Sequence, residues 1–499
     1  MITVNVKRYD PVKDEKYLES YEIKESDKMK VLDALQTINE EYDANIAYRY
    51  SCRAGQCGSC AIKINGEAKL ACKAEINDND LLEPLNDDVI KDLIVDRTKL
   101  NDKTRDLNMY LSYEDERIGK RKPDIILPTL YEQTDALRSC IGCYSCLAMC
   151  PVLKKTSEFA GPYFMRGLSS ITFDPRGDES RSGQAVDSGL YCCTSCGKCS
   201  EVCPKEINIY GKAIEIIRAR AVQEKEGPLE AHKKIHDNVK NTGKSVGVDK
   251  DTGYDEGFAV EYNKTHQFNE KPKIAFFTGC MINNKLPWIA EYLVKILNKL
   301  GYEVDIPQQQ VCCGSPLLRT GQTDIIQDLV DSNYETFKDY DIILTVCAGC
   351  GATLKNNYPE YGAKLNVMDI SEFLEDKINP EDMKEVNLKV TYHDPCHLAR
   401  SQNITFQPRN ILNKIKGLTF VEMDKPAQCC GAGGGVKSGK SEIAEALADE
   451  KVEMIDKLDV DHVVTICPFC EYNIQDSLTK NNSEASVINL MELLNKAYD

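Results

Sequence analysis

Apolar and polar positions alternate through much of residues 1–105, as in Met1–Lys7 and Ala61–Ile64. A period of two is typical of half-buried β-strands, and Asn65-Gly66 after the second segment is a hairpin signal. Lys30–Tyr42 instead has the helical period, with its apolar residues on one face. The pattern therefore predicts a small α+β domain over residues 1–105.

Residues 106–240 carry short apolar patches beside two cysteine runs. The spacing predicts a mostly helical domain that includes a helix at Ala213–Gln223. Residues 241–270 are polar, with scattered glycine and aspartate and little periodicity, and we expect a linker there.

From Lys271 the pattern changes to alternating strands and helices. Pro287 and Gly301 mark the two ends of one predicted helix, because proline suits a first helical turn and glycine follows a helix end. The predicted strands are Ile274–Thr278, Tyr302–Ile306 and Asp341–Val346, and the predicted helices are Pro287–Leu300 and Thr323–Tyr340.

The same unit then repeats, with 31 residues between Cys280 and Cys312 and 32 between Cys396 and Cys429. We therefore predict two homologous α/β modules, module 1 over residues 271–385 and module 2 over residues 386–499. Their cysteines follow strands, so they should meet at one edge of each sheet. The predicted elements of module 2 are Val390–His393, Phe420–Met423, the helix Gly439–Lys457, and His462–Ile466.

The chain has 499 residues, 42% of them hydrophobic, and a net charge of −17, which indicates a folded multidomain protein. The acidic balance argues against a nucleic-acid binder, which needs a basic surface. No apolar stretch approaches the ~18 residues of a membrane span, and no signal peptide is evident, so we expect a cytoplasmic protein without a membrane span. Clustered C-x2-C spacings in such a chain point to metal rather than to disulfide bonds.

Twenty-two of the 23 cysteines fall into five groups. Gly55 and Gly58, inside the first group, let its loop wrap a cluster and aim backbone N–H groups at the sulfides. A structural zinc site is the alternative for four cysteines. The spacing is the plant-type one for a 2Fe–2S cluster, with Cys52, Cys57, Cys60 and Cys72 as ligands.

The second and third groups are two copies of C-x2-C-x2-C-x3-C-P, the bacterial two-cluster pattern. In that pattern the fourth cysteine of each run serves the other cluster. Cys192 belongs to no group, and we predict a buried neighbour that binds no metal. The predicted ligands of one 4Fe–4S cluster are Cys140, Cys143, Cys146 and Cys203. Those of the other are Cys193, Cys196, Cys199 and Cys150.

Residues 1–235 resemble the iron–sulfur subunits of succinate dehydrogenases and fumarate reductases, through Ser51–Cys60, Leu70-Ala-Cys72 and both four-cysteine runs. The resemblance implies a β-grasp 2Fe–2S ferredoxin domain followed by a helical two-cluster ferredoxin domain. In much of that family the position of Cys196 is not cysteine, and the cluster there is 3Fe–4S and typically passes electrons to quinone. Cys196 supplies the missing ligand, which implies a full 4Fe–4S cluster and argues against quinone.

The last two groups each read C…CCG…C-x2-C and resemble the CCG modules of the B subunit of heterodisulfide reductase from methanogens. Five thiolates exceed the needs of a cubane or a tetrahedral zinc site. The resemblance implies one noncubane 4Fe–4S cluster per module, both facing one substrate cleft. The ten cysteines, as ligands and catalytic residues, are Cys280, Cys312, Cys313, Cys347 and Cys350 in module 1, and Cys396, Cys429, Cys430, Cys467 and Cys470 in module 2.

The whole architecture resembles the family of B subunits of thiol:fumarate reductases of methanogenic archaea. The resemblance implies oxidation of coenzyme M and coenzyme B thiols to their heterodisulfide, with electrons passing through the cubane and 2Fe–2S clusters to a flavoprotein that reduces fumarate to succinate. FAD is expected only on that partner of a heterodimer, because this chain has no flavin fingerprint.

Two other functions are possible for the same cysteine pattern. One is the iron–sulfur subunit of a succinate- or glycerol-phosphate-type dehydrogenase that delivers electrons to quinone or another carrier. The other is an electron relay or assembly protein without a substrate of its own. The two complete five-cysteine sets favour thiol chemistry over both.

Arg319, Arg400 and Lys440 are candidates for binding the anionic groups of the coenzymes. Lys440 lies in Gly434–Ser441, which fits the Walker A pattern but does not directly follow a buried strand. We interpret the match as accidental, and keep a weaker hypothesis that the coenzyme B phosphate rests on the following helix N-terminus.

Two pairs of histidines have an ambiguous pattern. His393 and His397 flank Cys396, where they could relay protons from thiols or simply pack beside a cluster. His232 and His236 share one helix face with lysines between them, so we predict that both are solvated.

Overall fold

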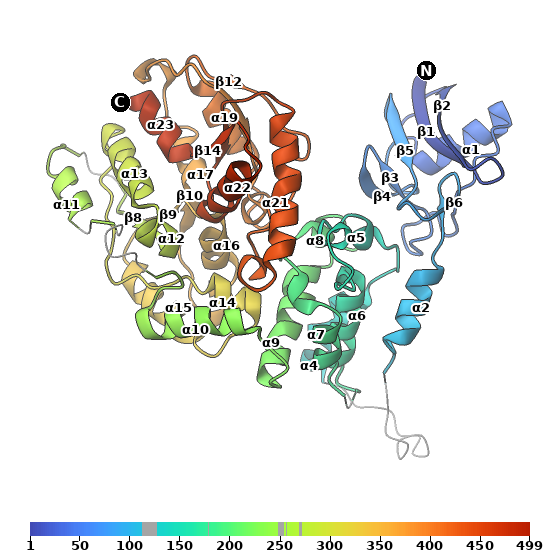
Figure 1. Cartoon of the computed structure of the whole chain (residues 1–499), viewed down its shortest axis with the longest axis horizontal. Coiled ribbons are helices and arrows are strands. Elements are labelled where there is room, and N and C mark those ends of the chain that lie inside the picture. Colours follow the sequence, from blue (N-terminus) through green and yellow to red (C-terminus); the bar gives the residue numbers. More distant parts are fainter. Residues whose placement is uncertain (112–126, 178, 248–253, 256, 269–271) are drawn as a thin grey trace. The chain divides into compact units, whose positions relative to one another are not determined.

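The computed structural model describes residues 1–111, 127–177, 179–247, 254–255, 257–268 and 272–499 (Figure 1). The chain folds into two compact units. The first comprises Met1–Leu190 and Gly197–Ile217, and the second comprises Tyr191–Cys196 and Arg218–Asp499. The short loop 191–196, which carries two cysteines of the third group, is thus part of the second unit.

The first unit begins with a five-stranded sheet in the order β2-β1-β5-β3-β4. The hairpin between β3 and β4 turns at Asn65-Gly66, whose φ angles of 52° and 79° explain why glycine and asparagine suit this position. Helix α1 (Val31–Tyr42) buries the apolar face that its period predicts, so the α+β prediction is confirmed. The strands are β1 (Ile2–Asp10), β2 (Glu15–Ile23), β3 (Ala61–Ile64), β4 (Glu67–Leu70), β5 (Asp80–Glu83), β6 (Val89–Lys91) and β7 (Ile94–Val95).

The rest of the first unit consists of short helices joined by cysteine-bearing loops, as predicted for residues 106–240 (Figure 1). Proline stands in the first turn of both α4 and α6, where its missing N–H costs nothing. The elements of this region are α2 (Thr98–Asp106), α4 (Pro128–Arg138), α5 (Ser145–Ala148), η1 (Val152–Lys154), α6 (Pro162–Thr172), α7 (Ser182–Asp187), η2 (Leu190–Cys192), α8 (Lys198–Glu201), η3 (Tyr210–Ile214) and α9 (Glu215–Gln223).

Module 1, in the second unit, has a parallel sheet in the order β10-β9-β8. The predicted strand Tyr302–Ile306 does not form. Only Asp305 bridges to β8, because Pro307 has no N–H with which to extend the ladder. The elements are β8 (Ile274–Phe277), α12 (Gly279–Asn284), α13 (Pro287–Lys299), α14 (Ser315–Thr320), α15 (Ile326–Phe337), β9 (Ile342–Thr345), α16 (Ala348–Asn356), η4 (Tyr358–Tyr361), β10 (Val367–Asp369), α17 (Ile370–Leu374) and η5 (Pro380–Asp382).

Module 2 repeats this topology with a parallel sheet in the order β12-β11-β13-β14. β12 occupies the place that the Asp305 bridge has in module 1, so the predicted duplication extends to the strand order. Its elements are β11 (Lys389–Tyr392), α18 (Cys396–Ala399), α19 (Phe406–Lys414), β12 (Thr419–Phe420), α20 (Val436–Gly439), α21 (Ser441–Asp456), β13 (His462–Thr465), α22 (Pro468–Lys480), β14 (Ser486–Asn489) and α23 (Leu490–Tyr498).

Residues 241–270, which we expected to be a linker, contribute folded structure where they are described. Helix α11 (Phe258–Asn263) packs on α13 and buries Ala259. The backbone N–H of Tyr254 donates to Asn283 O at 2.9 Å. Before them, α10 (Glu230–Thr242) ends at Gly243 in the left-handed conformation. The polar composition of the segment gave no signal of this packing, because only a few of its residues face the core.

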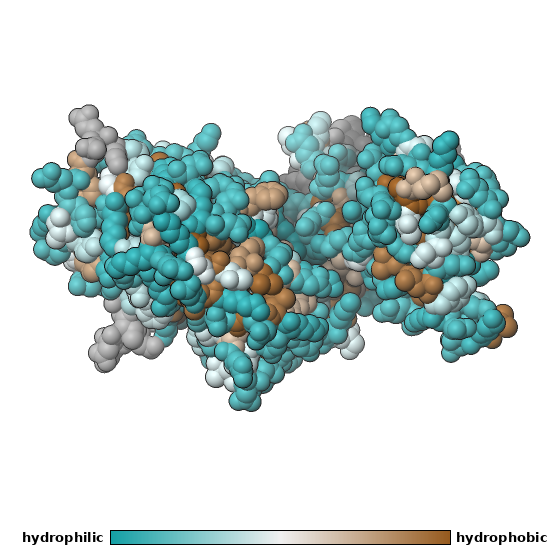
Figure 2. Space-filling view, turned by 90° about the horizontal axis from the view of Figure 1, so that it is seen from above, coloured by the Kyte–Doolittle hydropathy of each residue, from teal (hydrophilic) through white to brown (hydrophobic). Residues whose placement is uncertain are grey.

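Hydrophilic residues cover most of the face drawn in Figure 2, with smaller apolar patches between them. Within the described ranges, no helix combines the length and the apolar character that crossing a bilayer requires. This agrees with the absence of a long apolar stretch in the sequence.

Candidate functional site

The first cysteine group lies on the loop between α1 and β3, closed by Cys72 after β4. Cys52 Sγ accepts hydrogen bonds from the N–H groups of Ala54 and Gln56 at 3.4 and 3.3 Å. Hydrogen bonds from Ser59 and Cys52 lower the pKa of Cys57 to about 6. Burial raises the pKa of Cys60 to about 11, with Cys72 beside it. The loop therefore brings the four thiols together and offers N–H donors to an anionic centre.

One predicted set of cubane ligands lies within the first unit. Burial raises the pKa of Cys146 well above its ordinary value, and neighbouring thiolates add to the effect. A small cavity there is lined by the four predicted ligands, namely Cys140, Cys143, Cys146 and Cys203. For the other predicted set, Cys150 and Cys199 belong to the first unit and Cys193 and Cys196 to the second, and this set remains a prediction.

All ten cysteines of the two modules line one cavity of about 570 Å³ in the second unit. Nine of them are buried, and Cys396 is partly exposed. The topology explains the convergence, because each C-x2-C pair begins a helix directly after a parallel strand, β9 in module 1 and β13 in module 2. We call this the cysteine cavity.

The thiols in the cysteine cavity lie close together but are free. Cys313 Sγ is 3.3 Å from Cys350 Sγ, and Cys430 Sγ is 3.4 Å from Cys470 Sγ, well beyond a disulfide bond of about 2.05 Å. The two modules meet at Cys467, whose thiol pairs with that of Cys347 and whose pKa is lowered by this contact and by Cys470. Thiolates of lowered pKa are the form that binds iron.

The donor set of the cysteine cavity fits iron–sulfur clusters. Each module contributes five thiols, more than a tetrahedral zinc ion takes. His393 is 1% exposed, and its side chain interacts with the thiol of Cys430. One ring nitrogen of His393 and the Sγ atoms of Cys430 and Cys470 all lie within 4.8 Å of one another. A buried imidazole beside two thiols suits an additional polar group in that space.

His397 is also buried in the wall of the cysteine cavity. Burial, and next the charge of Arg319, lower its pKa to about 4. Its Nε2 donates to Ser195 O at 2.9 Å. The neutral imidazole therefore holds the loop 191–196 against module 2, rather than being positioned to relay protons.

Of the three cations predicted to bind substrate anions, only Arg319 lines the cysteine cavity. Arg400 instead donates from Nη1 to Cys196 O at 3.2 Å, and Lys440 is not in the wall. The lysines that do line it, which the sequence did not single out, are Lys285 and Lys437. Lys437 could have been predicted as a cavity residue from the sequence, because it lies on α20, which directly follows the glycine run.

The glycine run Gly431–Gly435 provides room for a neighbouring chain segment. A Cβ atom on Gly433 would come within 2.7 Å of Thr194 O, and one on Gly435 within 2.7 Å of His232 Nε2. The loop 191–196 therefore packs directly on module 2. The Walker-type match at residues 434–441 is explained by this packing, and its glycines need no nucleotide.

Arg218 joins the loop 191–196 to both modules. It is fully buried, and Nη2 donates to Cys193 O at 2.8 Å. Its Nη1 donates to Arg319 O at 2.5 Å and to Gly434 O at 3.2 Å. The guanidinium also stands over the Tyr191 ring, 5.3 Å from its centroid. A single side chain thus binds carbonyls from the loop, module 1 and module 2.

We expect Arg218→Met to destabilise the second unit by about 3 kcal/mol, because buried carbonyls lose a charged donor. Urea-induced unfolding of the full chain measures the change. Arg220→Met, two residues further along α9, removes only a half-exposed ion pair with Glu224 and should cost about 0.5 kcal/mol or less. Equal effects of the two substitutions would contradict the role assigned to Arg218.

The prediction that His232 is solvated is wrong. His232 is fully buried, and its Nε2 donates to Gly435 O at 2.9 Å. His236, one turn on, is partly exposed and pairs with Asp324 at 3.0 Å. Lysines between the two histidines suggested a solvated face, but the loop 431–439 of module 2, over 190 residues away in sequence, covers His232.

Burial lowers the pKa of His232 below its ordinary value of 6.5. The folded state keeps the ring neutral, whereas the unfolded chain takes a proton below pH 6.5, so stability present above that pH is lost as the pH falls. We therefore expect a steeper loss of thermal stability between pH 7.5 and 5.5 in the wild type than in His232→Gln. His236→Gln is the control and should keep the wild-type slope. Parallel slopes for wild type and His232→Gln would refute the expectation.

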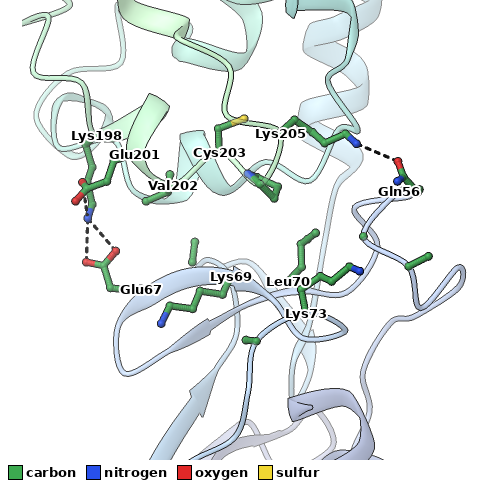
Figure 3. A pocket seen from close by; sticks show the side chains of 15 residues that line it. Gln56, Glu67, Lys69, Leu70, Lys73, Lys198, Glu201, Val202, Cys203 and Lys205 are labelled. Atoms are coloured by element: carbon green, nitrogen blue, oxygen red, sulfur yellow. Dashed lines mark hydrogen bonds and ion pairs between the residues drawn. The ribbon is translucent and has the colours of Figure 1, made fainter. Parts of the chain in front are cut away.

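A second cavity, of about 810 Å³, lies in the first unit between the loop of the 2Fe–2S group and the end of the third group (Figure 3). Lys198 Nζ pairs with Glu67 at 2.8 Å, and Lys205 Nζ donates to Gln56 Oε1 at 3.0 Å. Cys203 stands in the wall of this cavity. These pairs tie the 2Fe–2S loop and hairpin to the segment that carries one predicted cubane ligand.

Three family models match the chain. The model described as "2Fe-2S iron-sulfur cluster binding domain" matches residues 3–102, and "4Fe-4S dicluster domain" matches residues 136–207. "Cysteine-rich domain" matches twice, at residues 274–355 and 390–475. With the grouped thiols described above, these domains define an iron–sulfur oxidoreductase component of mixed α+β and α/β architecture.

The B subunit of fumarate reductase (CoM/CoB) of Methanothermobacter marburgensis is 54% identical over 500 residues, covering 100% of this chain and 99% of that protein. The chain belongs to this family of fumarate reductase (CoM/CoB) B subunits. The D subunit of dihydromethanophenazine:CoB--CoM heterodisulfide reductase of Methanosarcina barkeri is 30% identical over 76% of this chain and 98% of its own length. A solved structure of a hypothetical protein from Helicobacter pylori has a TM-score of 0.60 at 13% identity, covering 99% of this chain and 94% of that one, which shows a shared fold.

Proposed function

We propose that this protein oxidises the thiols of coenzyme M and coenzyme B to their heterodisulfide in the cysteine cavity. Electrons would pass through two cubane 4Fe–4S clusters and one 2Fe–2S cluster to a flavoprotein partner that reduces fumarate to succinate. The two thiols release two electrons and two protons as the S–S bond forms, and fumarate takes up two of each. FAD is proposed only for the flavoprotein partner.

The observation that carries the proposal is the convergence of all ten module cysteines on one cavity of about 570 Å³. That size lies within the range of small-molecule sites, roughly 300–1,000 Å³. Five thiols from each module support two noncubane 4Fe–4S clusters facing the same space. Such clusters, when bound, stabilise sulfur as thiolate and accept one electron each, which matches a two-electron disulfide reaction.

The chain's own side chains would hold and orient the two substrates. Arg319 and Lys285 line the module 1 side of the cavity, and Lys437 lines the module 2 side, so anionic tails can bind at either side. Phe469 and Tyr472 of module 2 add aromatic surface to the wall of the cavity. Burial of the cysteines keeps water from the sulfurs.

Contacts of the loop 191–196 support an electron route that leaves the cysteine cavity from module 2. The thiol of Cys196 lies within hydrogen-bonding reach of Cys429. His397 and Arg400 of module 2 bind the carbonyls of Ser195 and Cys196. A proposed cubane ligand therefore touches a proposed ligand of the module 2 cluster, and short ligand-to-ligand steps favour electron transfer.

The test supplies the purified full-length chain with both coenzyme thiols and a one-electron acceptor dye. We expect the dye to be reduced only when both thiols are present. One heterodisulfide should form for every two electrons that reach the dye. Quinone reduction without thiols would instead support the dehydrogenase-type alternative. Absence of both reactions, in a chain with its full iron content, would reduce the protein to an electron relay and overturn the proposal.

A further inference from the structure

The two modules, although duplicates, differ in the buried side chain that binds the loop before the paired cysteines. In module 1 this side chain is Asn333 of α15, whose Nδ2 donates to Cys312 O at 3.3 Å and whose Oδ1 accepts from Val311 N at 3.0 Å. In module 2 it is Lys451 of α21, whose Nζ donates to Lys425 O at 3.0 Å and Pro426 O at 3.3 Å. Module 2 therefore has a buried ammonium before its paired cysteines in addition to a neutral amide, since Asn473 Nδ2 donates to Cys430 O at 2.5 Å.

Lys451 is fully buried and has no carboxylate within ion-pair distance among the described residues. Besides the two carbonyls, the one further hydrogen-bond partner of its Nζ in the described part of the chain is Met423 Sδ, at 3.5 Å. Asp394, the nearest buried carboxylate of module 2, is bound at 3.0 and 2.8 Å by Arg409, which also pairs with Glu422. The positive charge of Lys451 is therefore not neutralised by a side chain.

The charge of Lys451 acts on the cysteines of module 2. Burial lowers its pKa to about 8, against the opposing attraction of thiolates at Cys430 and Cys429, the carboxylate of Asp394 and the thiolate of Cys470. A buried positive charge stabilises a neighbouring group that gains negative charge, and in a low-dielectric interior this effect reaches several ångströms. Net charge and nearby donors are among the factors that set the potential of an iron–sulfur cluster.

We propose that Lys451 makes the cluster of module 2 easier to reduce than the cluster of module 1, so that electrons taken from the substrate thiols collect beside the loop 191–196. The inference rests on the proposed function, since it needs a cluster in each module. His393, which replaces Phe277 at the matching strand end, also lies on the module 2 side. Both of these polar replacements are in module 2, whose His397 and Arg400 bind the loop 191–196.

The test is a redox titration of the full-length chain followed by electron paramagnetic resonance. The wild type should show two module clusters with unequal midpoints. Lys451→Met, whose side chain is of similar length but neutral, should keep its iron. The higher of the two midpoint potentials should fall by at least about 59 mV, which is a tenfold change in the equilibrium constant for reduction. Lys451→Arg should keep the wild-type midpoint. Lys457→Met, an exposed neutralisation at the C-cap of the same helix, is the matched control and should shift neither.

Equal midpoints in the wild type would overturn the proposal whatever the variants do. Unshifted midpoints in an iron-replete Lys451→Met chain would also overturn it. These outcomes differ from failure of the proposed function itself, because in that case the wild type would show no module clusters at all in its iron content and spectra.

Discussion

Replacing Cys467 by serine is expected to lower thiol-dependent fumarate reduction by at least about 100-fold, since removing a metal ligand costs more than removing a residue that only supports one. Cys467 follows β13, caps α22, and pairs with both Cys347 and Cys470. The helix N-terminus and these thiols favour its thiolate. The reaction is measured on the complex with its flavoprotein, with both thiols in excess, and iron should fall by about four per chain.

Cys192→Ala provides the matched control for Cys467→Ser. Cys192 is fully buried but belongs to none of the five cysteine groups, so its removal should leave iron and activity near the wild-type values. The spectra of the 2Fe–2S and cubane clusters should be retained in both variants. Full activity in Cys467→Ser would place the reaction outside the cysteine cavity.

Replacing Cys196 by serine should interrupt electron flow without removing the substrate site. Cys196 is a predicted cubane ligand and touches Cys429 of module 2. Three cysteines would then remain for that cluster, the ligand set that the related succinate dehydrogenase subunits use for a 3Fe–4S centre. We expect a 3Fe–4S signal in the oxidised protein and at least about a tenfold loss of thiol-dependent fumarate reduction.

Heterodisulfide formation with a dye that reaches the cysteine cavity should persist in Cys196→Ser, because the ten module cysteines are unchanged. Ser195→Ala alters the neighbouring side chain, and the backbone carbonyl that His397 binds stays in place. That control should behave as the wild type. Undiminished fumarate reduction in Cys196→Ser would mean that electrons leave the cavity by another route.

The sequence predicted the parts of this chain that depend on local spacing. Asn65-Gly66 turns the β3–β4 hairpin because two residues with positive φ fit a tight turn. The duplicated cysteine spacing predicted two modules, and the strand orders β10-β9-β8 and β12-β11-β13-β14 agree with it. Strands followed by cysteines also predicted that the thiols of each module meet at one edge of its sheet, and the ten thiols line one cavity.

Features that depend on contacts distant in sequence could not be predicted in this way. His232 has a polar helical neighbourhood, yet the glycine run of module 2 covers it. Tyr302–Ile306 has a strand-like pattern, but Pro307 limits pairing to one bridge. Arg400 was chosen for its closeness to Cys396 in sequence, and its guanidinium binds the loop 191–196. In each case the neighbour that decides the outcome lies in another element, which local periodicity does not report.

Iron analysis of the full-length chain, combined with Mössbauer spectroscopy, tests whether the ten cysteines of the two modules hold two iron–sulfur clusters around one cavity. We expect about 18 irons per chain, of which about eight have spectra distinct from 2Fe–2S and cubane clusters. About 10 irons, all in 2Fe–2S and cubane form, would contradict this expectation.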